Sequence, residues 1–329
     1  MVPWSLGGAL QIDQMEVIAG IDIGGTNTEI GLVDKAGSIL FSARLSTKSF
    51  SKPEDFIREA SAKIREGISK TGTTLIGIGI GAPSANYYSG SIEFAPNMPW
   101  EGIIPLAAMM EAEMKVKCKL TNDANAAALG ELLFGDAKFL RDFVVVTLGT
   151  GLGSGFVVNG DLLYGHDGFA GELGHVIVEP EGRLCGCTRK GCLETYVSAT
   201  GIVNTAKEYL KEANKESLFY GVTENELTAK FISDAASKND FFALKLMDYT
   251  AKKLGFALAN MVAITSPSHI FLYGGLAKSG DTLLVPLKKY YEEFVLRNYS
   301  GKVKIQLSGL PENAAVLGAA ALGWKEAEN

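Results

Sequence analysis

The densest group of metal-binding side chains lies between residues 171 and 194, GELGHVIVEPEGRLCGCTRKGCLE. One imidazole and three thiols come from His175, Cys185, Cys187 and Cys192. Together they form a complete tetrahedral set for Zn²⁺, and a site with four protein ligands is structural because it leaves no position for a substrate. A disulfide framework is disfavoured, since Cys118 is the only other cysteine and lies in an apolar segment. The segment therefore predicts a structural zinc site.

Two turns rich in glycine and threonine follow predicted strands, and their composition is typical of phosphate binding. They are Gly24-Gly25-Thr26-Asn27 and the sequence GTGLGSG at 149–155. Glycine lets several backbone N–H groups converge on an anion, and threonine hydroxyls add donors. Either turn alone is more often a plain hairpin, but two related turns that face each other across a cleft favour a shared phosphate site. Neither matches GxxxxGK(S/T), nor GxGxxG before a helix, so a P-loop ATPase and a Rossmann dehydrogenase are disfavoured.

The pair Asn122-Asp123 follows a strand directly and opens an alanine-rich helix. Asn or Asp at such a position ordinarily caps the helix by accepting from its unpaired N–H groups. One of the two can cap while the other projects from the strand end, where α/β folds gather their ligands. A carboxylate there could act as a general base towards a hydroxyl group.

Apolar runs and their periodicity predict the elements that carry these residues. In the first half, strands are expected at 17–23, 28–33, 38–45, 75–80 and 116–120, with helices from Pro53, at 103–113 and at 124–134. The stretch 81–100 is expected to be a long functional loop. In the second half, strands are expected at 143–148, 156–158, 162–163, 269–273 and 303–307, with helices at 195–213, 225–237, 240–264, 283–297 and 314–325. Residues 21–33 and 148–158 share one plan of strand, turn and strand, which indicates an internal duplication.

Composition excludes several other classes of protein. The chain has 329 residues, 47% of them hydrophobic, which suits two α/β lobes. The net charge of −6, without long runs of Lys or Arg, argues against nucleic acid or an anionic membrane as a partner. No apolar run is long enough to span a bilayer, and the N-terminus lacks the features of a signal peptide. Reduced, metal-bound cysteines and no export signal predict a cytoplasmic protein, and residues 1–15 are expected to be a disordered leader or an added extension.

These motifs together resemble the ROK family (repressor, open reading frame, kinase) of sugar kinases. The resemblance runs from Glu16 to the C-terminus and rests on DIGGT at 22–26, ND at 122–123, LGTGLGSG at 148–155, GELGH at 171–175, CGCxxxGCLE at 185–194 and YGG at 273–275. The cysteine signature is the most specific of these motifs. The usual CGCG reads CGCT here, with Thr188 in place of glycine, which removes no metal ligand.

The resemblance implies an α/β fold of the two-lobed, actin-like (ribonuclease H-like) ATPase type, with duplicated βββαβα cores and a zinc-pinned loop. The expected division is a leader at 1–15, an N-terminal lobe at 16–122 plus 312–329, and a C-terminal lobe at 123–311 that contains the zinc loop 175–192. The helix at 314–325 is expected to return to the N-terminal lobe, and the active site to lie between the lobes.

The resemblance also implies roles for individual residues. Asp123 is expected to be the base that takes the proton from a sugar 6-hydroxyl as it attacks ATP, and Asp22 to lie near Mg²⁺. The expected nucleotide-binding residues are Asp22, Gly24, Gly25, Thr26, Asn27, Gly149, Thr150, Gly151, Gly153, Gly274 and Gly275, the last two at the adenosine. The expected sugar-binding residues are Gly81, Ala82, Pro83, Asn97, Asn122, Asp123, Glu172, His175 and Glu194. His175 would serve the zinc with one ring nitrogen and the sugar with the other.

The implied activity is an ATP-dependent hexose kinase, and the run CLETYVSATGI favours glucose. An N-acetylhexosamine (N-acetylglucosamine or N-acetylmannosamine) or fructose is the alternative substrate. A sugar-responsive transcriptional regulator is the rival from a different class, but only 21 residues precede Asp22, which is too few for a helix-turn-helix domain. A zinc-stabilised sugar-binding protein without catalysis is a further rival. A homodimer is the family default.

Overall fold

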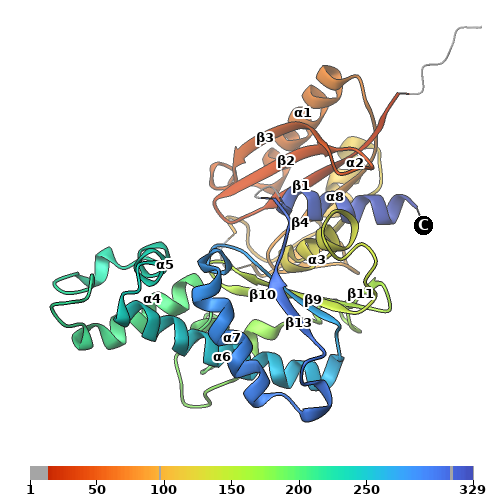
Figure 1. Cartoon of the computed structure of the whole chain (residues 1–329). Coiled ribbons are helices and arrows are strands. Elements are labelled where there is room, and N and C mark those ends of the chain that lie inside the picture. Colours follow the sequence, from red (N-terminus) through yellow and green to blue (C-terminus); the bar gives the residue numbers. More distant parts are fainter. Residues whose placement is uncertain (1–13, 96–97, 312–313, 329) are drawn as a thin grey trace, which may run out of the picture.

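Two five-stranded sheets form the frame of the protein (Figure 1). The computed structural model describes residues 14–95, 98–311 and 314–328. In the first sheet the strand order is β3 (Ile39–Ser46), β2 (Asn27–Val33), β1 (Glu16–Ile23), β4 (Thr74–Gly81) and β8 (Cys118–Thr121). Strands β1, β4 and β8 run parallel, whereas β2 is antiparallel to both of its neighbours.

The second sheet repeats this plan strand for strand. Its order is β11 (Asp161–Leu162), β10 (Leu152–Val158), β9 (Phe143–Leu148), β12 (His269–Tyr273) and β13 (Lys304–Leu307). Strands β9, β12 and β13 run parallel, and β10 is antiparallel to both of its neighbours. The internal duplication inferred from two short motifs is therefore confirmed over the whole of both sheets.

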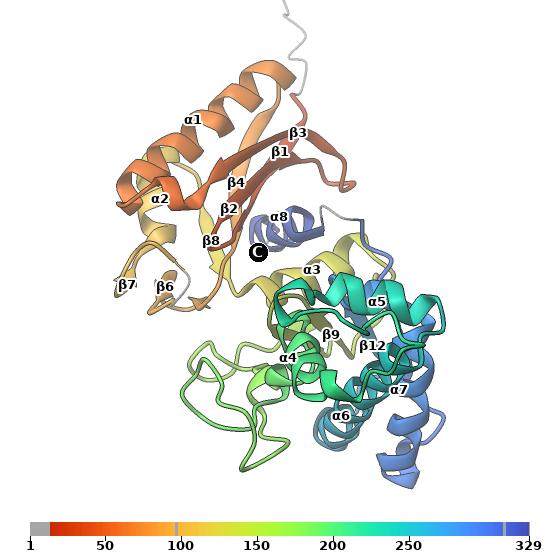
Figure 2. The same cartoon turned by 90° about the vertical axis from the view of Figure 1, so that its left-hand side faces the viewer.

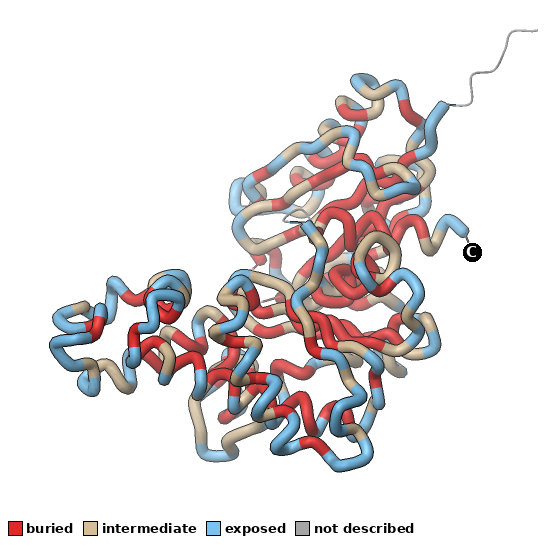
Figure 3. Tube along the Cα trace, viewed as in Figure 1, coloured by how far each residue is buried: buried red, intermediate tan, exposed pale blue. Residues whose placement is uncertain are grey.

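Two helices lie between the sheets, and the other helices lie outside them (Figures 1 and 2). The inner pair is α3 (Asp123–Phe134) and α8 (Ala314–Ala327), which pack on each other. Helices α1 (Pro53–Thr71) and α2 (Leu106–Met114) cover the first sheet, and α4 (Ala199–Tyr209), α5 (Ala229–Ser237), α6 (Phe241–Thr265) and α7 (Asp281–Phe294) belong to the second half. Helices α4 and α5 extend to the side of the second sheet (Figure 1). Buried residues concentrate in the two sheets, in the inner pair of helices and in α6 (Figure 3).

Glycines in the first sheet allow α8 to approach it closely. A Cβ atom on Gly79 of β4 would lie 1.9 Å from the carbonyl oxygen of Ala319, and one on Gly20 of β1 would lie 2.3 Å from that of Val316. Any larger residue at these positions would push the helix off the sheet. The last helix of the chain thus packs on the first sheet, while α3 contacts strands of both sheets. The exact division into lobes at residues 122 and 123 stays a prediction.

The structure differs from the sequence-based expectation mainly in residues 81–104. The expected long loop contains short strands, β5 (Ala85–Asn86) and β6 (Ser91–Glu93), and β6 pairs with β7 (Ile103–Ile104). The expected helix at 103 therefore begins only at Leu106. Pro105 explains the shift, because a residue that precedes proline is disfavoured in the helical region.

Smaller differences concern helix ends in the second half. Helix α4 begins at Ala199 rather than 195, where the Ser198 side chain caps it, and α5 begins at Ala229 rather than 225, where Thr228 caps it. Helix α7 ends at Phe294 rather than 297. In the described part of the chain, no helix is long and apolar enough to cross a membrane.

Candidate functional site

The carboxyl ends of three parallel strands bring the first two candidate carboxylates together. In the strand register Asp22 of β1 is opposite Gly81 of β4, and Gly81 is opposite Thr121 of β8. Asp123 follows Thr121 by two residues. A Cβ atom on Gly81 would lie 3.8 Å from the Cα atom of Asp123 and 3.9 Å from Oδ1 of Asp22. The missing side chain of Gly81 thus leaves space between the two aspartates.

Asp123 is the first residue of α3. Oδ1 of Asn122 and Oδ1 of Asp123 both accept from the backbone N–H of Ala124, each at 2.8 Å. Asn122 is the N-cap of α3, so the expectation that one of the pair caps the helix is confirmed, and Asp123 shares the same N–H. Asp123 reaches solvent, but the surrounding protein desolvates its carboxyl group, and this burial raises its pKa. A carboxylate with a raised pKa is a stronger base than an ordinary one.

The carboxyl group of Asp22 is also perturbed by its surroundings. Burial, and then the negative charges of Asp123 and Glu29, raise the pKa of Asp22 to about 7. A cation between Asp22 and Asp123 would offset this repulsion, and Mg²⁺ prefers carboxylate oxygens. The residues present therefore fit an Mg²⁺ ion, with Asp22 as the side chain to hold it.

The two glycine turns occupy equivalent places in the two sheets. The first joins β1 to β2, and within it the N–H of Gly24 donates to the carbonyl oxygen of Asn27 at 2.9 Å. The second joins β9 to β10, and within it the N–H of Gly149 donates to the carbonyl oxygen of Gly151 at 3.0 Å. A Cβ atom on Gly153 would lie 2.8 Å from that of Ala124, so the second turn lies beside the first turn of α3.

A cavity of about 250 Å³ lies at the end of β12, next to Gly274 and Gly275. Gly274 has a φ of 104°, and a Cβ atom there would lie 2.7 Å from the carbonyl oxygen of Leu148, so only glycine suits the position. The residues that line the cavity are Leu272, Tyr273, Gly274, Gly275, Ala277, Lys278, Leu307, Ser308, Leu310 and Pro311. Its mixed apolar and backbone lining suits the base and ribose of a nucleotide.

The candidate sugar-binding carboxylates come from the two ends of residues 171–194. Burial raises the pKa of Glu172, and the charges of Asp123 and Glu194 raise it further against the opposing effect of His175. Nε2 of His175 lies 3.9 Å from Oε2 of Glu172. The structure thus brings Glu172 into the electrostatic reach of Asp123, His175 and Glu194. Gly81, Ala82 and Pro83 follow at the end of β4. Asn97 lies outside the described residues.

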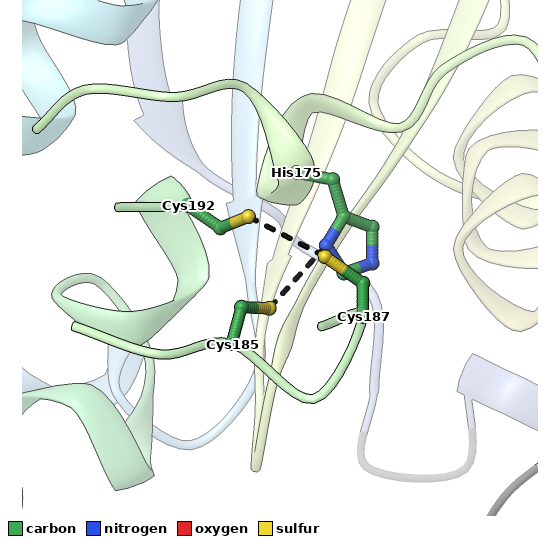
Figure 4. A group of neighbouring side chains, drawn as sticks. All are labelled: His175, Cys185, Cys187 and Cys192. Carbon is green, nitrogen blue, oxygen red and sulfur yellow. Dashed lines mark hydrogen bonds between the residues drawn. The ribbon is translucent and has the colours of Figure 1, made fainter. Parts of the chain in front are cut away.

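The four candidate zinc ligands converge from a 3₁₀ turn and a tight loop (Figure 4). Their ligand atoms all lie within 4.8 Å of one another. Sγ of Cys185 is 3.7 Å from Nδ1 of His175, and Sγ of Cys187 is 3.6 Å from Sγ of Cys192. A tetrahedral site with Zn–S bonds of about 2.3 Å needs sulfur atoms about 3.8 Å apart. The donor set and its spacing therefore fit Zn²⁺.

The three thiols of the cluster differ in pKa, because burial raises that of Cys185 to about 12 and also raises that of Cys192, whereas that of Cys187 is lowered. Burial alone would raise the pKa of the Cys187 thiol, but hydrogen bonds from Arg189 and from the neighbouring thiols lower it to about 6. Because thiolates are the form that binds zinc, Cys187 is prepared for the metal at neutral pH. Zinc bound here would supply a fixed link between four points of the loop.

Sequence analysis missed two residues that hold this region in place. The hydroxyl of Ser154 donates to the carbonyl oxygen of Gly171 and accepts from the N–H of Leu173, so it fixes both neighbours of Glu172. The guanidinium of Arg183 donates to Glu208, Thr205 and the carbonyl oxygens of Thr195 and Gly201. All five of its N–H groups are used. The only sequence signal was the position of each residue inside a recognised motif or loop.

Comparison with known proteins was consistent across sequence and structure. The family model described as ROK family matches residues 18–326. A glucokinase of Halalkalibacterium halodurans is 38% identical over 94% of this chain and 95% of its own length. A xylose repressor of Caldicellulosiruptor bescii is 29% identical over 93% of this chain and 77% of its own length. The crystal structure of a ROK family glucokinase from Streptomyces griseus in complex with glucose and AMPPNP superposes with a TM-score of 0.79 at 31% identity, covering 94% of this chain and 99% of that one.

Proposed function

This chain belongs to the ROK family, and we propose that it is an ATP-dependent hexose kinase that phosphorylates the 6-hydroxyl group of glucose. The observation that carries the proposal is the meeting of Asp22 and Asp123 across the bare Gly81 position, with the start of α3 beside the second glycine turn. Kinase relatives that match over almost their whole length support the same activity.

In this proposal Asp123 is the general base. Its carboxylate accepts the proton of the sugar 6-hydroxyl as the oxygen attacks the terminal phosphorus of ATP, and the bond from that phosphorus to the bridging oxygen breaks, so that ADP leaves. The raised pKa supports this role, because the proton is held more firmly in the transition state. Phosphoryl transfer depends mainly on positioning and on charge neutralisation. The groups around Asp123 should therefore contribute more to the rate than the base itself.

The nucleotide would extend from the cavity at Gly274 and Gly275 to the two glycine turns. Gly24, Gly25, Thr26 and Asn27 would hold phosphate groups from one side, and Gly149, Thr150, Gly151 and Gly153 from the other. Asp22 would hold the Mg²⁺ ion, which supplies positive charge at the phosphates. The position of Asp22 at the end of β1, directly before the first turn, supports this assignment.

The sugar would be bound by polar groups near Asp123. These are Asn97, Asn122, Glu172, His175 and Glu194, with Gly81, Ala82 and Pro83 as part of the pocket wall. Carboxylates and amides suit a polyol because each bridges neighbouring hydroxyl groups. The geometry of His175 supports a double role, since Nδ1 faces Cys185 and Nε2 faces Glu172. His175, Cys185, Cys187 and Cys192 would hold the zinc.

The test is a coupled assay of ADP release with a panel of sugars. Glucose, N-acetylglucosamine, N-acetylmannosamine and fructose are compared by kcat/KM at equal ATP and Mg²⁺. We expect glucose to have the highest value by at least tenfold. A higher value for an N-acetylhexosamine or for fructose would make that sugar the substrate. Sugar binding without turnover of any sugar would refute the kinase and favour a regulator, a function that the xylose repressor relatives represent.

We also propose a homodimer in the cytoplasm, as the family resemblance implies. Light scattering of the purified protein at micromolar concentration tests the oligomeric state. A mass of twice the 35.0 kDa of one chain is expected.

A further inference from the structure

The interior of the protein contains a carboxylate that the proposed mechanism does not use. Glu131 lies on α3 and is fully buried. Its Oε2 accepts a hydrogen bond from the hydroxyl of Ser308 at 2.6 Å, and its Oε1 accepts one from the backbone N–H of Asp136 at 3.0 Å. Burying a carboxylate costs free energy, and hydrogen bonds from fixed donors only partly offset that cost. The contacts of Glu131 therefore suggest a role other than stability.

Ser308 connects Glu131 to the cavity beside Gly274 and Gly275. The hydroxyl oxygen of Ser308 also accepts from the backbone N–H of Leu310 at 3.2 Å. Ser308, Leu310 and Pro311 line that cavity, whereas Glu131 does not. The chain of contacts from Glu131 through Ser308 to Leu310 thus fixes one wall of the cavity from behind.

A second close contact places residues 308–310 against the end of α3. A Cβ atom on Gly309 would lie 2.7 Å from Oδ2 of Asp136, the residue whose N–H binds Glu131. The wall is therefore fitted closely to α3 over residues 308–310. The same helix carries Asp123 at its first position, eight residues before Glu131, or about 12 Å along the helix axis.

We propose that Glu131 is a positioning residue, which fixes the cavity wall of Ser308, Leu310 and Pro311 to α3 and thereby sets the affinity for ATP. The proposal rests on the proposed function in one respect, since that function makes the cavity the nucleotide site. It also gives α3 a double task. One end of the helix presents the base to the sugar, and the other end holds the wall against which the nucleotide binds.

The deciding variant is Glu131→Met, which fills similar volume without an acceptor and is expected to fold. We expect its affinity for the non-hydrolysable analogue AMPPNP, measured by calorimetry with Mg²⁺, to fall about tenfold, with a matching rise in KM for ATP. The KM for glucose should change little, whereas the melting temperature should fall by a few degrees, because the Ser308 hydroxyl and the Asp136 N–H lose their acceptor. Glu131→Gln should restore the affinity to within about threefold, because the amide can accept from Asp136 N–H and donate to Ser308 Oγ.

Asp240→Asn is the matched control. Asp240 is also a buried carboxylate, and it accepts from the Ser217 hydroxyl and from the backbone N–H of Leu218. It caps α6, and neither Asp240 nor these partners line the cavity. This variant should lower the melting temperature and leave AMPPNP affinity unchanged. If Glu131→Met does not fold, Ser308→Ala, which removes the donor of the same hydrogen bond, takes its place with the same expected loss.

The outcomes separate this inference from the proposed function. Wild-type protein that does not bind AMPPNP refutes the proposed function. Wild-type protein that binds it, together with a folded Glu131→Met or Ser308→Ala variant of unchanged affinity, overturns the role of Glu131 alone. A fall in affinity that the glutamine variant does not restore would equally contradict the proposed hydrogen-bonded link.

Discussion

The carboxylate of Glu194 accepts a hydrogen bond from the backbone N–H of Leu152, with 3.1 Å between Oε2 and N. Its other oxygen, Oε1, lies 3.5 Å from Sγ of Cys185. A Cβ atom on Gly151 would lie 2.3 Å from Oε2, so the glycine turn has to be bare for this contact to form. One side chain thus joins the candidate zinc loop to the second glycine turn. The two motifs are therefore neighbours in space and are connected by a direct side-chain contact.

Glu194→Gln should therefore affect both substrates. The amide can keep the bond from Leu152 only by turning its NH₂ group towards Cys185, which disturbs the candidate zinc site. We expect KM to rise about tenfold for glucose and about threefold for ATP, roughly the effect of losing one or two hydrogen bonds. Glu172→Gln is the control. Because Glu172 faces His175, this variant should raise the KM for glucose and leave the KM for ATP unchanged. An unchanged KM for both substrates in Glu194→Gln would show that this carboxylate does not couple the cysteine loop to the glycine turn.

Asp123→Asn should abolish turnover and leave the fold intact. Asparagine still accepts from the N–H of Ala124, so the helix start is preserved, but it cannot take a proton. Loss of a general base costs about 10²–10⁴-fold in kcat. Glucose and AMPPNP affinities should stay within a few-fold of the wild type. Near-normal kcat in this variant would rule out Asp123 as the base.

The raised pKa of Asp22 predicts a specific pH dependence of stability. The folded protein keeps the Asp22 proton up to about pH 7, whereas the unfolded chain releases it near the ordinary value of 3.8. The folded state therefore binds more protons in this range, and stability without ligands falls as pH rises from about 4 to 7. Asp22→Asn removes this loss, so its advantage in unfolding free energy should grow by about 1–3 kcal/mol between pH 5 and pH 8.

Urea denaturation at the two pH values measures this difference. ATP turnover of Asp22→Asn should be nearly lost, because the variant lacks the proposed Mg²⁺ ligand. The control is Glu59→Gln, which replaces an exposed carboxylate on α1. It should change neither the pH dependence of stability nor ATP turnover. Equal stability differences at pH 5 and pH 8 would mean that Asp22 ionises normally.

Thr188 offers a test of strain in the loop of the candidate zinc ligands. It stands where the family motif usually has glycine, and it has a φ of 72°, which is strained for a β-branched residue. Thr188→Gly should relieve this backbone strain. Glycine also adds entropy to the unfolded chain, and after that cost the net gain in stability should be about 1 kcal/mol. The loop would then be closer to its metal-binding conformation, and zinc affinity by competition titration should rise about fivefold.

Thr188→Ala is the matched control for that measurement. It removes the branch at Cβ but keeps the Cβ atom, so its gain in zinc affinity should be smaller than that of the glycine variant. An equal gain in both variants would assign the effect to the lost hydroxyl group and not to backbone strain.

The sequence was sufficient to predict most of the frame and the members of the site. Continuous apolar runs such as Phe143–Leu148 predict inner strands, and the structure has this run buried on both faces of the second sheet. The misplaced start of α2 shows the limit, because a two-residue strand at Ile103–Ile104 has no periodicity of its own. Its pairing with β6 and the proline that follows decide the outcome.

The contacts that position the site could not be predicted in the same way. Ser308 and Glu131 are 177 residues apart in sequence and meet only because β13 ends beside α3. Arg183 forms a hydrogen bond with Glu208 of α4, which is 25 residues away in sequence. No local pattern specifies the path of the loop that brings them together. Even the meeting of Asp22 with Asp123 requires the register of β1, β4 and β8. Motifs predict which residues matter, and tertiary packing decides what each one touches.

Loss of the proposed zinc site should weaken the proposed sugar site more than the fold. Cys187→Ser takes away one of four ligands, and metal content by mass spectrometry should fall to near zero. The loop keeps other anchors, because Arg183 binds α4 and Lys253 pairs with Glu179, so the melting temperature should drop by only a few degrees. His175 would lose its partner at Nδ1, and its Nε2 would no longer be held towards Glu172, so glucose KM should rise at least tenfold. Cys118→Ser, a buried cysteine outside the cluster, should keep both zinc and glucose KM. If Cys187→Ser lowered stability alone, the metal would be unconnected to the sugar pocket and His175 would serve only one of its two proposed partners.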